Sequence, residues 1–222
     1  MQSTLVRETG TILLKTQGTA DYKEMIANET KFESGMFIKT DKESYARVFL
    51  PDNSLISLNE NTEVQINFEG NQIDIQQLIG KIWNRVQTVT TGGEYKVTTP
   101  NTIAAVRGTI FGVGVDDKDN SRVFVEAGNV EVSKHETLED PKALDTTDLN
   151  IGDLARIVRD AKSFQIIKGQ LDQTFKDSFW YKRNKILDEE WLKNKDLKGA
   201  DLIKSLRESL LQRNNYLEYK LA

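Results

Sequence analysis

Between about residues 10 and 160, apolar and polar residues alternate in short runs. Clear runs lie at 46–50, 56–58, 64–68 and 73–75. Because successive side chains of a strand point to opposite faces, this period of two predicts strands with one apolar face. Turn-forming residues, such as those at 51–54 and 69–71, separate the runs. The pattern is typical of a β-sandwich or a solenoid-like roll of many short strands.

After residue 160 the apolar spacing changes to three or four residues. It is seen at Leu171, Phe175 and Phe179 and again from Leu202 to Leu210, and it predicts two amphipathic helices. The predicted fold is therefore mainly β with a C-terminal α-helical appendage. We expect a tail at 1–9, an all-β domain at 10–160 and an amphipathic helical extension at 161–222.

The composition of the 222-residue chain is that of a folded globular protein, with 38% hydrophobic and 29% charged residues. With a net charge of −4, the chain lacks the positive electrostatic field that phosphate binding needs, so we expect no nucleic acid partner. Cysteine is absent, which excludes disulfides, thiolate zinc sites and a cysteine nucleophile. No apolar run is long enough for a membrane span, so we expect membrane contact only through a segment absent from this chain.

The stretch 95–115 places one arginine, Arg107, directly before Gly108 in a β-branched run. A kink at the glycine would leave carbonyl groups unpaired, and a guanidinium could satisfy several of them at once. This interpretation makes Arg107 a backbone staple. The alternative is that Arg107 binds an anionic ligand.

In the same stretch, Gly112 and Gly114 share one parity of the strand and leave that face without side chains. The pattern predicts close approach of neighbouring backbone or a bulge. Pro100 has no N–H to donate, so we place it at the entrance of a strand or at an edge, with a turn at Asn101.

These residues resemble the FecR domain. "YKVTTPNTIAAVRGTIFGV", followed by "RVFVEAGNVEV", is similar to its Thr-Pro pair, its Val-Arg-Gly-Thr motif and its final Gly-x-Val-x-Val. "SYARVFLPDNSLISLNENTEV" is similar to the strand that ends in Leu-x-Asp-Gly-Ser, with Asn53 in place of glycine, and "LIGKIWNRV" is similar to the connecting segment. The residues that carry the structural motif are Pro100, Val106, Arg107, Gly108, Thr109 and Gly128.

The resemblance implies an extracytoplasmic domain, periplasmic or at the cell surface, that relays signals or binds a protein partner at the bacterial envelope. We expect this chain to be a fragment whose signal or membrane anchor lies upstream. The leading hypothesis is a non-enzymatic interaction or signal-relay module without cofactors. The alternative is a carbohydrate- or surface-polymer-binding module, and a hydrolase with a hidden acidic site comes third.

Other candidate groups favour structural roles. His135 lies in a polar stretch that we interpret as a solvated surface loop. The loop at 116–121 crowds carboxylates but lacks the calcium-loop pattern, so we interpret it as a hairpin connection with no metal. Phe179 and Trp180 are expected to pack against the β body. If part of the helical stripe stays unburied, Phe179, Trp180 and Trp191 would form a partner surface.

Overall fold

The computed structural model describes residues 3–87, 92–135, 143–159, 164–194, 196–197, 201–202, 204–205 and 208. The chain divides into two compact units, Met1–Leu171 and Asp172–Ala222. We call them the β unit and the helical unit.

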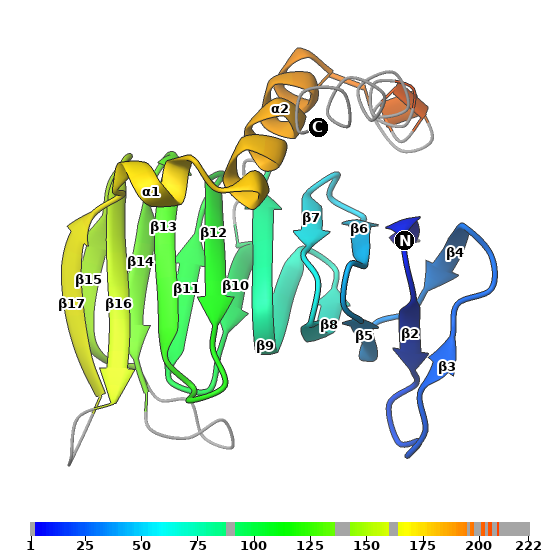
Figure 1. Ribbon diagram of the computed structural model, residues 1–222, viewed down its shortest axis with the longest axis horizontal. Helices are drawn as coiled ribbons and strands as arrows, with labels where there is room; N and C mark the ends of the chain where they lie inside the picture. Colours follow the sequence, from blue (N-terminus) through cyan, green and yellow to red (C-terminus); the bar gives the residue numbers. More distant parts are fainter. Residues whose placement is uncertain are drawn as a thin grey trace. The chain divides into compact units, whose positions relative to one another are not determined.

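The described part of the β unit consists of two sheets that share strand β9 (Figure 1). Sheet 1 contains, in spatial order, β4 (Glu29–Phe32), β1 (Ser3–Thr9), β6 (Tyr45–Phe49), β7 (Leu55–Leu58), β9 (Gln72–Arg85), β12 (Ile110–Val115), β13 (Ser121–Ala127), β16 (Asp153–Arg159) and β17 (Phe164–Gln170). Sheet 2 contains β3 (Lys23–Glu24), β2 (Ile12–Lys15), β5 (Met36–Thr40), β8 (Thr62–Glu69), β9, β10 (Glu94–Thr98), β11 (Thr102–Val106), β14 (Val130–Lys134) and β15 (Leu144–Leu149). Neighbouring strands are antiparallel except β9 and β10, which are parallel. The predicted mainly β sandwich or roll is confirmed.

The β unit is held together by an apolar core to which both sheets contribute. Buried core residues include Ile56 and Phe111 of sheet 1 and Ile38 and Val132 of sheet 2. Each lies at an alternate position of its strand, as the period of two requires. The strands predicted from the runs at 46–50, 56–58, 64–68 and 73–75 are present as β6, β7, β8 and the first part of β9.

One polar contact crosses this core. The hydroxyl of Tyr95, on β10, donates to Oδ1 of Asn84, on β9, over 3.0 Å, and both side chains are fully buried. Burial raises the pKa of the Tyr95 phenol well above its usual value, so the hydroxyl remains a donor. A buried bond of this kind fixes how the two sheets face each other, because any shift would leave both groups unpaired.

The turn between β6 and β7 confirms the expectation for Asn53. This residue has φ of 66°, which is the left-handed region where glycine is usual and asparagine is tolerated. The carboxylate of Asp52 accepts hydrogen bonds from the N–H and the hydroxyl of Ser54. The turn therefore keeps its shape without glycine.

The predicted domain boundaries need two corrections. Ser3–Thr9 is not a tail but strand β1, which pairs with β4 and β6 and buries Leu5 completely. Phe164–Gln170 is not helical but strand β17, which pairs along β16. Both segments bury a few apolar residues against the core. The free energy gained by this burial stabilises them as strands, although their alternation of apolar and polar residues is short and irregular.

At one end of the β unit, two lysines join the outermost strands of the two sheets. Lys168 of β17 donates from Nζ to the Asp148 carbonyl of β15 over 2.8 Å. Lys134 of β14 donates to the Phe164 carbonyl of β17 over 3.1 Å and pairs with Asp145 of β15. Because these contacts occupy carbonyl groups at the sheet edges, they oppose the addition of a further strand.

Asp153 makes this end of the β unit sensitive to pH. Its carboxylate accepts hydrogen bonds from Lys168 Nζ, the Asn150 N–H and Gln170 Nε2, and the Lys168 bond is the main reason that the Asp153 pKa lies below its usual 3.8. A folded pKa below the unfolded one adds stability above the unfolded pKa, and that stability is lost as the pH falls through the folded pKa.

We therefore expect Asp153→Asn to destabilise the protein clearly at about pH 7 and much less at about pH 3. Urea denaturation at both pH values measures the difference. Asp117→Asn, in an exposed loop, is the control and should show no such pH dependence. A loss of stability for Asp153→Asn that is equal at both pH values would contradict the expectation.

The helical unit contains α1 (Gln173–Lys176) and α2 (Phe179–Lys193). The sequence predicted one helix over this region, and the break arises because Asp172 and Ser178 each cap a separate helix by accepting a backbone N–H. The predicted second helix falls largely outside the described residues, although 201–202, 204–205 and 208 are helical. No helix among the described residues is long and apolar enough to cross a membrane.

Candidate functional site

The Val-Arg-Gly-Thr motif forms the connection that carries the chain from sheet 2 to sheet 1. Val106 is buried at the end of β11, and Gly108 has φ of 97°, a conformation that favours glycine. The Thr109 carbonyl accepts the N–H of Val86 over 3.0 Å. The motif therefore fastens the crossing point to the end of β9.

Gly128, at the turn between β13 and β14, packs against this crossing. Its φ is 82°, and a Cβ there would lie 3.0 Å from Thr109 Oγ1 and 3.1 Å from the Gly108 carbonyl oxygen. The Thr109 hydroxyl donates to the neighbouring Asn129 carbonyl over 2.8 Å. The structure thus brings Gly108, Thr109 and Gly128 together.

The staple interpretation of Arg107 is wrong. Its side chain is exposed, and within the described part of the chain no carbonyl oxygen accepts a hydrogen bond from its guanidinium. Gly108 accommodates the turn through its positive φ of 97°.

A backbone staple does exist at another arginine, Arg7 of β1. Its guanidinium donates to the Met25 carbonyl over 3.1 Å, to the Ile26 carbonyl over 2.8 Å and to the side chain of Asn28. These bonds hold the connection between β3 and β4 on β1. No local sequence pattern marks this staple, because Arg7 is 18 positions or more from the carbonyl groups that it binds.

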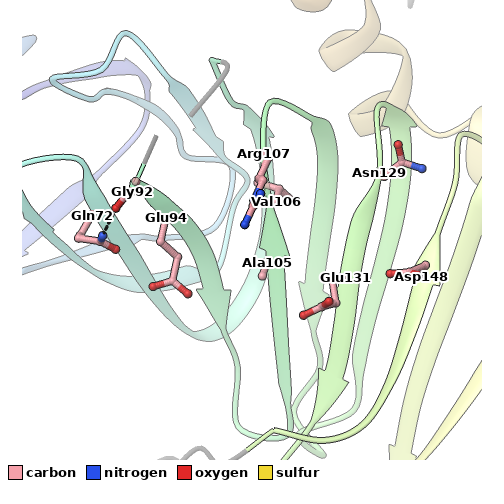
Figure 2. Close-up of a pocket in the computed structure, with 10 residues that line it drawn as sticks. Gln72, Gly92, Glu94, Ala105, Val106, Arg107, Asn129, Glu131 and Asp148 are labelled. Carbon is pink, nitrogen blue, oxygen red and sulfur yellow. Dashed lines mark hydrogen bonds between the residues drawn. The ribbon is translucent and has the colours of Figure 1, made fainter. Parts of the chain in front are cut away.

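Arg107 instead lines an open cleft of about 950 Å³ on the outer side of sheet 2 (Figure 2). Its lining residues come from the strand ends of β9, β10, β11, β14 and β15. They are Gln72, Gly92, Gly93, Glu94, Ala105, Val106, Arg107, Asn129, Glu131 and Asp148. Figure 2 shows Ala105 between Glu94 on one side and Glu131 and Asp148 on the other.

The charged groups of the cleft have no partners within the described residues. Glu94, Glu131, Asp148 and Arg107 are all exposed, and none of their charged groups makes an ion pair or a hydrogen bond there. The cleft thus carries three carboxylates and one guanidinium that are free to bind a ligand. The sequence motif points to Arg107 but not to the three carboxylates.

Pro100 lies in the turn between β10 and β11, beside a buried polar network. Asn101 is fully buried and donates from Nδ2 to the Asp119 carbonyl over 2.6 Å. His135 is part of this network. Its imidazole Nε2 lies 2.8 Å from the Thr99 carbonyl oxygen, and its backbone N–H donates to the Asn101 carbonyl. The prediction of a solvated surface histidine is wrong, because these hydrogen bonds allow the imidazole to be completely buried.

The loop between β12 and β13 is a polar hairpin connection, as predicted. The carboxylate of Asp116 accepts the N–H groups of Lys118 and Asn120 and the side-chain amide of Asn120. Those bonds hold the pKa of Asp116 below its usual value although burial opposes this. No cluster of three or more metal-ligating side chains lies within the described ranges.

The aromatic candidates of the helical unit have unequal exposure. Trp180 and Trp191 are buried, whereas the Phe179 side chain is 43% exposed. The ring of Phe175 packs edge to face against Trp180 and Tyr181. Of these three aromatic side chains, the exposed one is Phe179.

A pair of aromatic rings on sheet 2 bears on the carbohydrate alternative. Tyr22 and Phe37 lie near the surface, but Lys15 Nζ lies 4.8 Å from the Tyr22 ring centre and 4.1 Å from that of Phe37. The Tyr22 hydroxyl donates a hydrogen bond to Glu63 Oε1 over 2.7 Å. Because the lysine covers both rings, they do not form an open platform for a sugar.

Comparisons with known proteins agree with the fold. The family model for FecR protein matches residues 36–131. Two crystal structures, each of a candidate anti-sigma factor from Parabacteroides distasonis, are similar with TM-scores of 0.50. One is 22% identical and is matched over 61% of this chain and 60% of its own length. The other is 20% identical and is matched over 70% and 63%.

At these identities the likeness concerns the fold, and this chain spans less than two thirds of either solved protein. A search of curated proteins gave no match.

Proposed function

Because residues 36–131 of this chain carry a FecR domain, we propose that the protein binds a protein partner at the bacterial envelope and relays a signal from it. The family supports a signalling role. The two solved structures of similar fold are named as candidate anti-sigma factors, and that name also belongs to signalling.

The observation that carries the proposal is the cleft on sheet 2. Arg107 belongs to the motif by which the family is recognised, yet its guanidinium makes no bond within the described chain. It faces the same open space as Glu94, Glu131 and Asp148. Charged groups that the fold does not use are suited to a binding role.

The proposed role is binding rather than catalysis. Among the described residues that line the cleft there is no histidine, serine, threonine or lysine, so these residues offer no nucleophile activated by a neighbouring base.

Photo-crosslinking tests the partner-binding role. In cells of the bacterium that carries the gene, benzoylphenylalanine at Ala105 should give one specific protein adduct. The same group at Lys31, an exposed position on β4, is the control and should not give it. No adduct at Ala105, or the same adducts at both positions, would contradict the proposal.

The location outside the cytoplasm has its own test. The chain contains no cysteine, so Asp117→Cys introduces one exposed thiol. A membrane-impermeant maleimide should label this variant, within a cell envelope permeable to the reagent, before the inner membrane is broken. Labelling that requires lysis of the inner membrane would show that the domain lies in the cytoplasm.

A further inference from the structure

We propose that the cleft binds an extended basic segment of the partner protein, with a cationic side chain between Glu131 and Asp148 and an acidic group on Arg107. This inference rests on the proposed function and adds the chemistry of the partner. It follows from the register of the strands and from the charges that line the cleft.

Glu131 and Asp148 are directly opposite each other on neighbouring strands β14 and β15. Opposite residues on one face of a sheet have Cβ atoms about 5 Å apart, and like charges in this arrangement are destabilising. Lys168 Nζ reaches the main-chain carbonyl of Asp148, but no side chain among the described residues makes an ion pair with either carboxylate. A cation between the two carboxylates would remove the repulsion between them.

Several carboxylates elsewhere on the β unit are paired. Glu63 accepts the Tyr22 hydroxyl over 2.7 Å. Asp74, on the same strand as the cleft residue Gln72, lies 3.7 Å from Lys96 Nζ. Asp153 lies 2.8 Å from Lys168 Nζ. Exposed Glu69 and Asp117 make no ion pair among the described residues, so the distinguishing feature of the cleft is that Glu131 and Asp148 lie directly opposite each other.

The other side of the cleft carries both signs. Tyr95 and Val106 are register partners, so Glu94 and Arg107 follow as neighbours across the same two strands. They nevertheless form no ion pair within the described chain. Each is therefore available to a ligand, Glu94 for a second cation and Arg107 for a carboxylate, which a guanidinium binds with two parallel bonds.

The size and floor of the cleft favour a peptide. A volume of about 950 Å³ greatly exceeds that of a metal ion and is at the upper end for small-molecule pockets. Ala105 forms a low floor between the charged side chains, and the described lining also includes Gly92 and Gly93, which have no side chains. A main chain could approach closely there. The surplus of two negative charges among the lining side chains opposes nucleic acid and anionic lipid.

Binding of short synthetic peptides to the whole chain tests the inference. The probes are a fluorescent peptide with lysines at alternate positions and one glutamate at either end, and a matched peptide with glutamates in place of the lysines. We expect the lysine peptide to bind in about 20 mM salt and much more weakly in about 300 mM salt, because screening shortens the range of charge interactions. The glutamate peptide should not bind.

Matched variants place the binding in the cleft. Glu131→Gln with Asp148→Asn should weaken lysine-peptide binding about tenfold, as expected from the loss of two ion pairs. Glu69→Gln with Asp117→Asn changes the net charge equally at exposed positions outside the cleft and should leave binding unchanged. Arg107→Gln should weaken binding of the peptide that carries the glutamates. It should not weaken binding of a peptide in which glutamine replaces them.

A second readout concerns the free protein. Because Glu131→Gln with Asp148→Asn removes like-charge repulsion, it should raise the melting temperature without any peptide present. If Glu131→Gln with Asp148→Asn and Glu69→Gln with Asp117→Asn weakened lysine-peptide binding equally, the inference would be overturned. Absence of lysine-peptide binding in low salt would also overturn it. An Ala105 adduct with a partner that contacts the cleft through an acidic or neutral segment would overturn the inference alone and leave the proposed function intact.

Discussion

Replacing Gly112 with alanine is expected to destabilise the β unit by about 3 kcal/mol. Gly112, on β12, is opposite Phe124 on β13, and a Cβ at Gly112 would lie 2.2 Å from Phe124 Cζ. Phe124 is 1% exposed and packs edge to face against Trp83, with ring centres 5.1 Å apart. The ring has little room to move, so the strands must separate. Urea denaturation measures the loss.

Gly114→Ala is the matched control on the same strand. A Cβ there would lie 3.7 Å from Lys81 Cγ and 3.9 Å from the Gly80 carbonyl oxygen, which are ordinary contacts. We expect a change within about 0.5 kcal/mol. Phe124→Leu should lower the free energy of unfolding less in the Gly112→Ala background than in the wild-type protein, since the smaller side chain relieves the overlap. Similar effects for the two glycines would contradict the packing described here.

Replacing Arg7 with methionine is expected to lower the free energy of unfolding by about 1 to 3 kcal/mol. Methionine keeps much of the apolar stem but leaves the carbonyl groups of Met25 and Ile26 and the side chain of Asn28 without the bonds that Arg7 provides. The connection between β3 and β4 should loosen first. Chemical denaturation measures the stability, and amide hydrogen exchange at 25–28 locates the change.

Arg122→Met is the control for this prediction. Arg122 is an exposed strand residue, and none of its contacts within the described residues is a hydrogen bond or an ion pair from the side chain. The same loss of charge should leave the stability within about 0.5 kcal/mol. If Arg122→Met were as damaging as Arg7→Met, net charge rather than stapling would explain both.

The strands of the central region could be predicted because their signal is local. The run at 46–50 alternates with the period of a strand, and Asn53 follows in a turn that tolerates its φ of 66°. The FecR resemblance also rested on short contiguous motifs, and the family match over 36–131 confirms it. Features that depend on neighbouring residues along the chain are therefore readable from the sequence.

The errors concern long-range contacts. His135 lies in a polar stretch that favours a loop, but hydrogen bonds with Thr99 and Asn101, more than 30 positions away, bury it. Gly112 was expected to admit neighbouring backbone, whereas it admits the ring of Phe124. Which residue occupies such a space depends on strand register, and register is set by the whole sheet.

The cleft was missed for the same reason. Glu94 lies on β10, whereas Glu131 and Asp148 lie on β14 and β15, and β11 joins β10 to β14 in the sheet. The one available signal was parity, since Glu131 lies between buried Val130 and Val132 and must face outward. Without the order β10, β11, β14, β15, that parity could not show which other charges share the face.

Arg107→Met tests the central claim most directly, because it separates a binding arginine from a structural one. The measurement combines the melting temperature of the variant with the yield of the Ala105 adduct in cells. An unchanged melting temperature with a lost or strongly reduced adduct is the predicted result. A fall of several degrees with the adduct retained would show that Arg107 supports the fold after all and that the cleft does not bind through it.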